Sequence, residues 1–158
     1  MLWQTILNPA PAVPLPDDIY QFIDHLIMNE SEASILSGRN TSDIDPRQPS
    51  RLASVFYHFI SKGVKCVVIT LGAHGAVYQT AESDGFQHVE AATVKVVDTT
   101  AAGDTFVGAY AVKCGQNHAQ GGMGYVDGAI RKANKAAGLT VQRHGAQSAI
   151  PWLDEVGQ

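Results

Sequence analysis

Residues 97–106 read Val97-Asp98-Thr99-Thr100-Ala101-Ala102-Gly103-Asp104-Thr105-Phe106. The apolar residues that lead into Asp98 predict the end of a strand, and the small residues after it predict a turn. From Asp104 onward the apolar residues recur at helical spacing, which predicts a helix. This short stretch therefore predicts a strand, a turn and a helix in direct succession, which is the repeating unit of α/β folds.

The same alternation of strands and helices extends over the rest of the chain. The predicted strands are Gln4–Asn8, Leu26–Met28, Cys66–Leu71, Ala76–Gln79, Gln87–Ala91 and Val94–Val97. The predicted helices begin at Asp17, cover Ser31–Ser37 and Leu52–Lys62, begin again at Asp104, and follow a Gly121-Gly122 break to about Val141. Cys66–Leu71 is apolar on consecutive residues, which is typical of a strand buried on both faces. The pattern favours an α/β layered fold with a largely parallel sheet.

The composition limits the class of protein. The chain has 158 residues, 45% of them hydrophobic and 16% charged, which is enough apolar material for the core of one domain. A net charge of −4 argues against a nucleic-acid or anionic-membrane surface. No apolar run has the length of a membrane span, the first residues do not resemble a signal peptide, and the two cysteines give no disulfide framework. We expect a cytoplasmic protein, with the nucleus as an alternative.

Residues 98–104 carry the clearest chemical signal. Small residues allow a ligand to approach the backbone closely, and the amides at a helix start form an anion site. A carboxylate at that point, Asp104, would repel an anion unless it takes part in the reaction, for example as a base that accepts a hydroxyl proton. The structural alternative is that Asp104 caps the helix and Asp98 belongs to the turn. Two acids on either side of an all-small loop favour the functional interpretation.

Asp98–Ala111 resembles the second signature of the ribokinase, or PfkB-type, family of carbohydrate kinases. Asn29–Ala33 is similar to the family's Asn-Glu-x-Glu motif, and Val68–Gly75 to its nucleotide-binding strand and turn. Asn134 and Arg143–Gln147 resemble the helix beside the adenine and the cation-binding loop that follows it. The resemblance covers essentially the whole chain.

The resemblance implies a role for each matching residue. Asp104 would be the catalytic base, and the anion hole would be formed by Ala101, Ala102 and Gly103. The ATP site would include Asn29, Thr70, Leu71, Gly72, Ala73, His74, Gly75, Gly103, Asp104 and Asn134. Glu32 would order magnesium-bound water. A monovalent cation, K⁺, would be held by Asp98, Thr100 and the backbone carbonyls of Thr140, Arg143 and Gly145.

Two departures from the family pattern affect these expectations. The family often has serine at the position of Ala149, and here Ser148 lies one residue away, which weakens the expected cation site without removing its carbonyl ligands. The chain also matches only the C-terminal half of a ribokinase-like three-layer αβα sandwich. Residues 1–158 would be its nucleotide-binding and catalytic part, without the N-terminal sugar-binding and lid part.

The function that the resemblance implies is ATP-dependent phosphorylation of a sugar hydroxyl, with D-ribose converted to ribose 5-phosphate. The alternative is a truncated, catalytically inactive nucleotide-binding fragment that folds or acts only with a partner. The expected partners are a small sugar, ATP and Mg²⁺, with no nucleic acid and no membrane. Thr5–Leu7 would lie at a truncated sheet edge, so we also expect self-association there.

Overall fold

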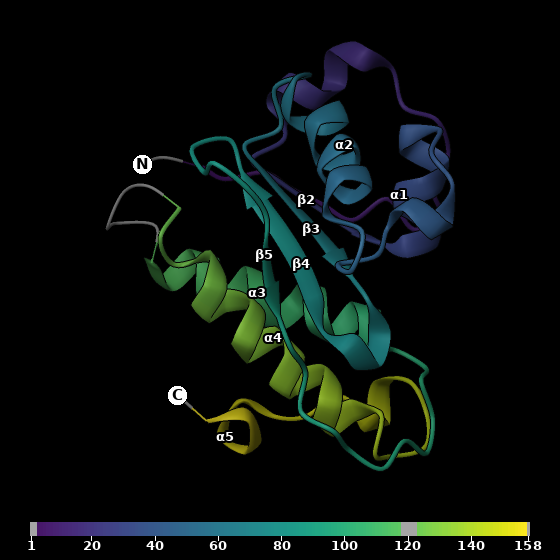
Figure 1. Cartoon of the computed structure of the whole chain (residues 1–158). Helices are drawn as coiled ribbons and strands as arrows, with labels where there is room; N and C mark the ends of the chain where they lie inside the picture. The colour runs from purple at the N-terminus through teal and green to yellow at the C-terminus, as the bar shows by residue number, and fades with distance from the viewer. Residues whose placement is uncertain (1–2, 118–122, 158) are drawn as a thin grey trace. The chain divides into compact units, whose positions relative to one another are not determined.

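The computed structural model describes residues 3–117 and 123–157 (Figure 1). The expected Gly121-Gly122 break lies outside the described residues. The chain divides into two compact units, Met1–Gly72 with Ala76–His88 and Ala73–Gly75 with Val89–Gln158. Each unit is therefore described by itself.

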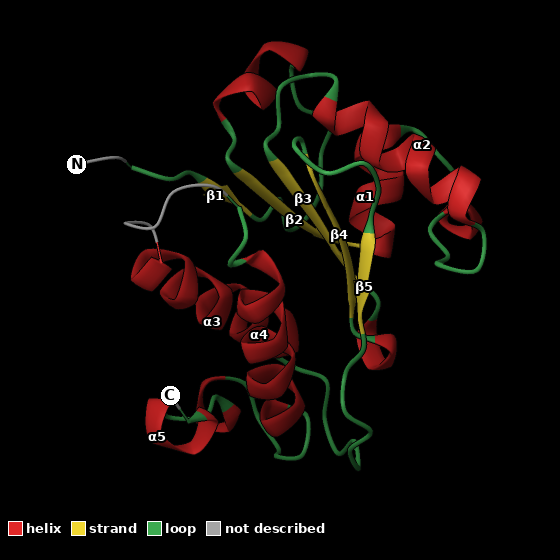
Figure 2. Cartoon of the chain, turned by 60° about the vertical axis from the view of Figure 1, so that its left-hand side comes forward, coloured by secondary structure: helices red, strands yellow, loops and turns green. Residues whose placement is uncertain are grey.

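The first unit is built on a sheet whose strands follow one another in the order β1-β2-β3-β4-β5 (Figure 2). The strands are β1 (Ile6–Leu7), β2 (His25–Asn29), β3 (Cys66–Thr70), β4 (Ala76–Thr80) and β5 (Gln87–Val89). β1, β2 and β3 run parallel to one another, and β4 returns antiparallel to β3. The last residue of β5, Val89, belongs to the second unit. The predicted α/β class and the mostly parallel sheet are confirmed.

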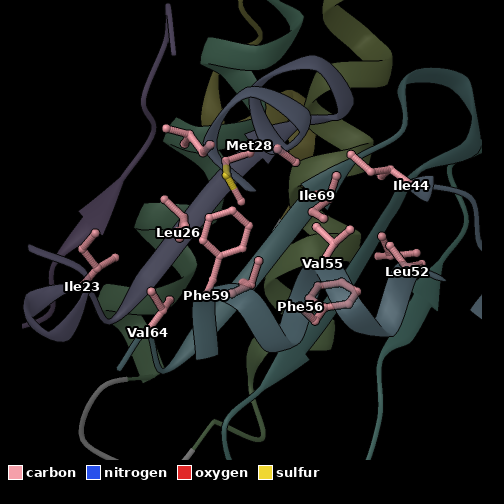
Figure 3. Close-up of a cluster of buried hydrophobic side chains, with 14 of the residues drawn as sticks. Ile23, Leu26, Met28, Ile44, Leu52, Val55, Phe56, Phe59, Val64 and Ile69 are labelled. Carbon is pink, nitrogen blue, oxygen red and sulfur yellow. The ribbon is translucent and has the colours of Figure 1, made fainter. Parts of the chain in front are cut away.

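Two helices of the first unit, α1 (Glu30–Ser37) and α2 (Pro49–Ile60), cover one face of this sheet (Figure 2). Figure 3 shows the buried side chains between α2 and the strands. The short 3-10 helices η1 (Asp17–Phe22), η2 (Thr41–Asp43) and η3 (Gly72–His74) connect the larger elements. The buried side of α2 presents residues at helical spacing, namely Leu52, Val55, Phe56 and Phe59. They form one hydrophobic core with alternate residues of β2 and β3, Leu26, Met28, Val67 and Ile69. The period of two in the strands and the period near 3.6 in the helix thus face each other.

The second unit contains α3 (Ala102–Asn117), α4 (Val126–Thr140), η5 (Gln147–Ala149) and α5 (Leu153–Val156). α3 and α4 lie side by side in both views (Figures 1 and 2). α3 buries Phe106, Tyr110 and Cys114, each four residues from the last. α4 buries mainly small residues, Val126, Ala129, Ile130, Ala133, Ala136 and Thr140. Alanine at these positions lets the two helices approach closely.

Val94–Val97 is not a strand, contrary to the sequence prediction. The amides of Val97 and Asp98 both donate to the carbonyl of Val141, at 2.7 and 3.1 Å, so this segment is held by the residue that follows α4. Its apolar residues predicted a sheet neighbour that it does not have. In the part of the chain that the structure describes, no helix combines the length and the hydropathy that a membrane span needs.

His25 is a buried titratable residue in β2, and it generates a prediction about acid. Burial lowers the pKa of His25 from 6.5 to about 4, with Asp24 raising it and Lys65 lowering it. The unfolded chain therefore takes up a proton near pH 6.5 while the folded chain does not. The contribution of His25 to the free energy of unfolding has its full value above pH 6.5 and falls by about 3 kcal/mol on acidification to pH 4. We expect His25→Gln to reduce this slope in urea unfolding, with a residual slope from His58, whose pKa burial also lowers. The lowered pKa of Asp24 acts only below this range, so an unchanged slope in the variant would contradict the assignment.

β1 is the terminal strand of the described sheet and generates a second prediction. Its two residues, Ile6 and Leu7, are half-buried, and nearby Trp3 is 82% exposed. An edge strand beside apolar side chains is a template for association. We expect the isolated chain to self-associate with rising concentration, as measured by light scattering, and Ile6→Lys to reduce the association. Hydrogen exchange at Thr5–Leu7 should slow in the associated form. A monodisperse wild-type monomer at all concentrations would be the opposite result.

Candidate functional site

Asn29 and Glu32 meet at the junction of β2 and α1, in the first unit. The Asn29 side chain accepts a hydrogen bond from the Glu32 amide, and the Glu32 carboxylate accepts one from the Asn29 amide, each at 2.8 Å. This reciprocal capping box satisfies amides at the start of α1 that have no partner within the helix. Asn29 is exposed and Glu32 half-buried. Both predicted site residues therefore also hold the helix start in place.

Thr70, Leu71 and Gly72 follow at the carboxyl end of the neighbouring strand β3. The parallel register pairs Thr70 with Asn29, so the predicted residues of these two strands are side by side. The Thr70 hydroxyl donates to the Met28 carbonyl at 3.4 Å, and Leu71 is buried. Gly72 has a φ of +55°, a left-handed conformation that starts the η3 turn. Ligands of open α/β sheets bind at this carboxyl end of the strands.

Gly75 and Asn134 belong to the second unit, where both contact the backbone that leaves β5. Gly75 has a φ of +85°, and a Cβ there would overlap the Val89 carbonyl oxygen and lie 2.7 Å from the Ala91 amide nitrogen. The Asn134 side chain donates to the carbonyls of Val89, at 3.2 Å, and Glu90, at 3.5 Å. Gly75, which follows η3, and Asn134, in the middle of α4, therefore both lie against the backbone of residues 89–91. Ala73 and His74, in the turn before Gly75, are exposed.

Asp98 joins two loops of the second unit. One carboxylate oxygen accepts from the Thr100 hydroxyl at 2.7 Å and from the Thr100 amide at 2.9 Å, and the other accepts from the Gly145 amide at 3.1 Å. The hydrogen bonds from Thr100, then that from Gly145, lower the pKa of Asp98 to about 2. The carboxylate is therefore ionised at neutral pH and able to face a cation. The structure brings together three of the predicted cation ligands, Asp98, Thr100 and Gly145.

The start of α3 presents backbone rather than side chains. Ala101, just before the helix, has a φ of +61°, which is rare for a residue other than glycine. Ala102 and Gly103 follow, and no described atom lies within 4 Å of the place a Cβ would take on Gly103. Gly103 and Asp104 are exposed. Because the first amides of a helix have no carbonyl partner within it, this end offers open amides of the kind that bind anions, with a carboxylate beside them.

The segment after α4 carries the remaining predicted cation ligands. The Thr140 carbonyl accepts from the Arg143 amide at 3.0 Å. The Arg143 guanidinium forms a salt bridge with Glu155 of α5, and the Glu155 carboxylate also accepts from the Trp152 amide at 2.8 Å. The place of a Cβ on Gly145 lies 2.5 Å from the Ser148 hydroxyl, so Ser148 lies directly against this loop. Glu155 was not predicted from the sequence, because its partner lies in another element.

The described residues contain no group of three or more His, Cys, Asp or Glu side chains placed to hold a metal ion. Magnesium is commonly held by one or two carboxylates together with substrate phosphates and water. The single carboxylate of Glu32 suits that kind of binding. The ionised carboxylate of Asp98, which lies against the loop of Gly145, is an oxygen donor that suits a monovalent cation.

Two glycines of the predicted nucleotide wall allow a matched test. Gly75→Ala forces a Cβ into the backbone at Val89 and adds strain at a positive φ, so we expect a loss of at least about 3 kcal/mol of stability. Gly72 has a positive φ too, but no described atom lies within 4 Å of its Cβ position, so Gly72→Ala should cost only about 1 kcal/mol. Urea unfolding of both variants measures the difference. Equal losses would show that the contact with Val89 does not constrain Gly75.

Comparisons with known proteins bear on the family and the fold of the chain. Residues 3–153 match the family model described as pfkB family carbohydrate kinase. Ribokinase of Staphylococcus aureus is 43% identical over 98% of this chain and 47% of its own length. The structure of Arabidopsis thaliana ribokinase complexed with ribose and ATP is 30% identical, with a TM-score of 0.80, over 97% of this chain and 46% of that one.

A structure of a putative ribokinase II from E. coli in complex with ATP and Mg²⁺ is 29% identical, with a TM-score of 0.66, over 89% of this chain and 40% of that one. The chain therefore spans about half the length of the curated relatives it matches. The likeness extends from β1 to the beginning of α5, so it includes every predicted site residue. The chain belongs to the pfkB family of carbohydrate kinases and has the ribokinase-like fold.

Proposed function

We propose that this chain is the nucleotide-binding and catalytic part of an ATP-dependent sugar kinase that transfers phosphate to the 5-hydroxyl of D-ribose. The observation that carries the proposal is the start of α3, where the Ala102 amide donates to the Thr99 carbonyl at 3.3 Å while the amides of Gly103 and Asp104 are open beside the exposed Asp104 side chain. Amides there can hold a phosphate while the carboxylate accepts a proton. Few other reactions need both groups in one helical turn.

Asp104 accepts the proton of the sugar hydroxyl in this proposal. The oxygen then forms its bond to the γ-phosphorus as the bond from that phosphorus to the leaving oxygen of ADP breaks. The amides of Ala101, Ala102 and Gly103 stabilise the charge on the phosphoryl oxygens during transfer. The chain's contribution is mainly position and electrostatics, as expected for phosphoryl transfer.

The proposal assigns nucleotide contacts to each unit. In the first unit, Thr70, Leu71 and Gly72 stand at the end of β3 with Asn29 beside them. In the second unit, the assigned residues are Ala73, His74, Gly75, Gly103, Asp104 and Asn134. A groove of about 390 Å³ in the second unit is lined by the apolar residues Ala92, Val94 and Leu139, by the amides of Asn134 and Gln142, by Gly138, and by the charged residues Glu90, Arg131 and Lys135. Its apolar residues suit the faces of a planar base, and its two side-chain amides suit the polar edge of that base.

Two cations accompany the nucleotide in this proposal. Magnesium, when bound with ATP, neutralises charge on the phosphates, and Glu32 would orient its water. A monovalent cation, K⁺, would be held by the Asp98 carboxylate and Thr100 with the carbonyls of Thr140, Arg143 and Gly145. The existing bond from Gly145 to Asp98 already places this loop beside the ionised carboxylate.

The choice of ribose rests on the relatives, several of which are ribokinases. The alternative is that these residues bind nucleotide without turnover and act only with a partner. Binding of MgATP without ADP release, across a panel of sugars, would select it.

The experiment that tests the proposal compares Asp104→Asn with a control, Asp154→Asn, another exposed aspartate of the second unit. ADP release is measured with MgATP and ribose, and MgATP binding is measured by NMR titration. We expect Asp104→Asn to keep the fold and to bind MgATP while turnover falls at least about a hundredfold, the usual effect of losing a general base. Asp154→Asn should behave as wild type.

Near-normal turnover of Asp104→Asn would remove Asp104 as the base. A folded wild-type chain whose resonances do not respond to millimolar MgATP would count against the nucleotide site itself.

A further inference from the structure

Thr105 and Thr140 form a buried hydrogen bond that connects the first turn of α3 to the last turn of α4. Their hydroxyl oxygens are 3.0 Å apart, and the residues are 5% and 0% exposed. The Thr140 hydroxyl also lies 3.2 Å from the Ala136 carbonyl of its own helix. No role has been given to either hydroxyl so far. A buried polar contact between two helices is specific in direction, whereas apolar packing is not.

The first turn of α3 has few other means of being held. Ala102 and Gly103 offer almost no side chain, and Asp104 points to solvent. Thr105 is the first residue of the helix that is buried, followed by Phe106. Its amide donates to the Ala101 carbonyl at 2.9 Å, so it is also attached to the left-handed residue before the helix. The position of the turn therefore depends on what holds Thr105.

The proton count sets the direction of the bonds. A threonine hydroxyl has one hydrogen to donate and two lone pairs to accept with. The arrangement that satisfies both buried hydroxyls has Thr140 donating to Ala136 and Thr105 donating to Thr140. Thr105 then depends on Thr140, while Thr140 keeps a partner without Thr105.

We propose that Thr105 and Thr140 are positioning residues, whose hydrogen bond fixes the first turn of α3 against α4 and so holds the amides of Gly103 and Asp104 in the geometry that receives a phosphate. This inference rests on the proposed function of that turn. Neither residue touches the nucleotide, and both act through the backbone of α3. The other end of the contact is Thr140 in α4. Its backbone carbonyl accepts a hydrogen bond from the Arg143 amide, so Thr140 is also joined to the segment after α4.

The test compares Thr140→Val, Thr105→Val and the double variant with the wild-type chain. Valine keeps the shape and removes the hydroxyl. Thr140→Ser keeps the hydroxyl and serves as the rescue, and Thr93→Val, at an exposed position of the second unit, is the control. Binding is measured by NMR titration with MgATP, and separately with AMP, which lacks the transferable phosphates. All variants are measured well below their unfolding temperatures.

We expect each valine variant, and the double variant, to weaken MgATP binding by the same factor of about three to ten, the worth of one hydrogen bond. AMP binding should not change, and Thr140→Ser should bind MgATP as wild type does. In urea unfolding, Thr140→Val should lose more stability than Thr105→Val, because only Thr140→Val leaves the Thr105 hydroxyl without its acceptor.

Unchanged MgATP affinity in both valine variants would overturn the inference and leave the pair a contribution to stability alone. Equal weakening of MgATP and AMP would also overturn it, because the effect would then not concern the phosphate end. Additive losses in the double variant would show that the two hydroxyls do not act as one contact. None of these outcomes bears on the proposed function, which is tested separately by MgATP binding to the folded wild-type chain and by its ADP release with sugar.

Discussion

The amides at the start of α3 must stay open if they are to receive a phosphate, and this constraint shapes much of the second unit. Residues that leave amides open cannot also hold the turn, so other atoms have to hold it. Asp98 ties the preceding loop to Thr100 and Gly145 through its ionised carboxylate, and Val141 holds the chain that leads to it. The start of α3 therefore has few side chains that could hold it, and the loops around it hold it in place.

In the first unit, two side chains of the candidate site also stabilise the fold. Asn29 and Glu32 satisfy each other's amides at the start of α1. Their interpretation as a helix cap and their interpretation as nucleotide and magnesium contacts are compatible, since each side chain retains further oxygen lone pairs. A loss of ligand binding in a variant of either residue would thus include a loss of helix stability. Conservative replacements that keep the capping hydrogen bonds would separate the loss of ligand binding from the loss of helix stability.

Local patterns in the sequence predicted most of the elements, because strands such as Cys66–Thr70 are short, apolar and bounded by glycine or polar residues. The same patterns were wrong for Val94–Val97, whose partner is the Val141 carbonyl rather than a strand. Resemblance located the candidate site residues. Neither source could find the pairing of Thr105 with Thr140, because it joins residues 35 positions apart and depends on how two helices pack.

Ala101 has a consequence for how stiff the loop before α3 is. An alanine in the left-handed region costs about 1 kcal/mol more than glycine would in the folded chain. Glycine, however, would lose more backbone conformational entropy, both on folding and on binding a ligand. Ala101 therefore destabilises the native state slightly, but it restricts the loop to few conformations before a ligand binds. Less conformational entropy then remains to be lost at the moment of binding.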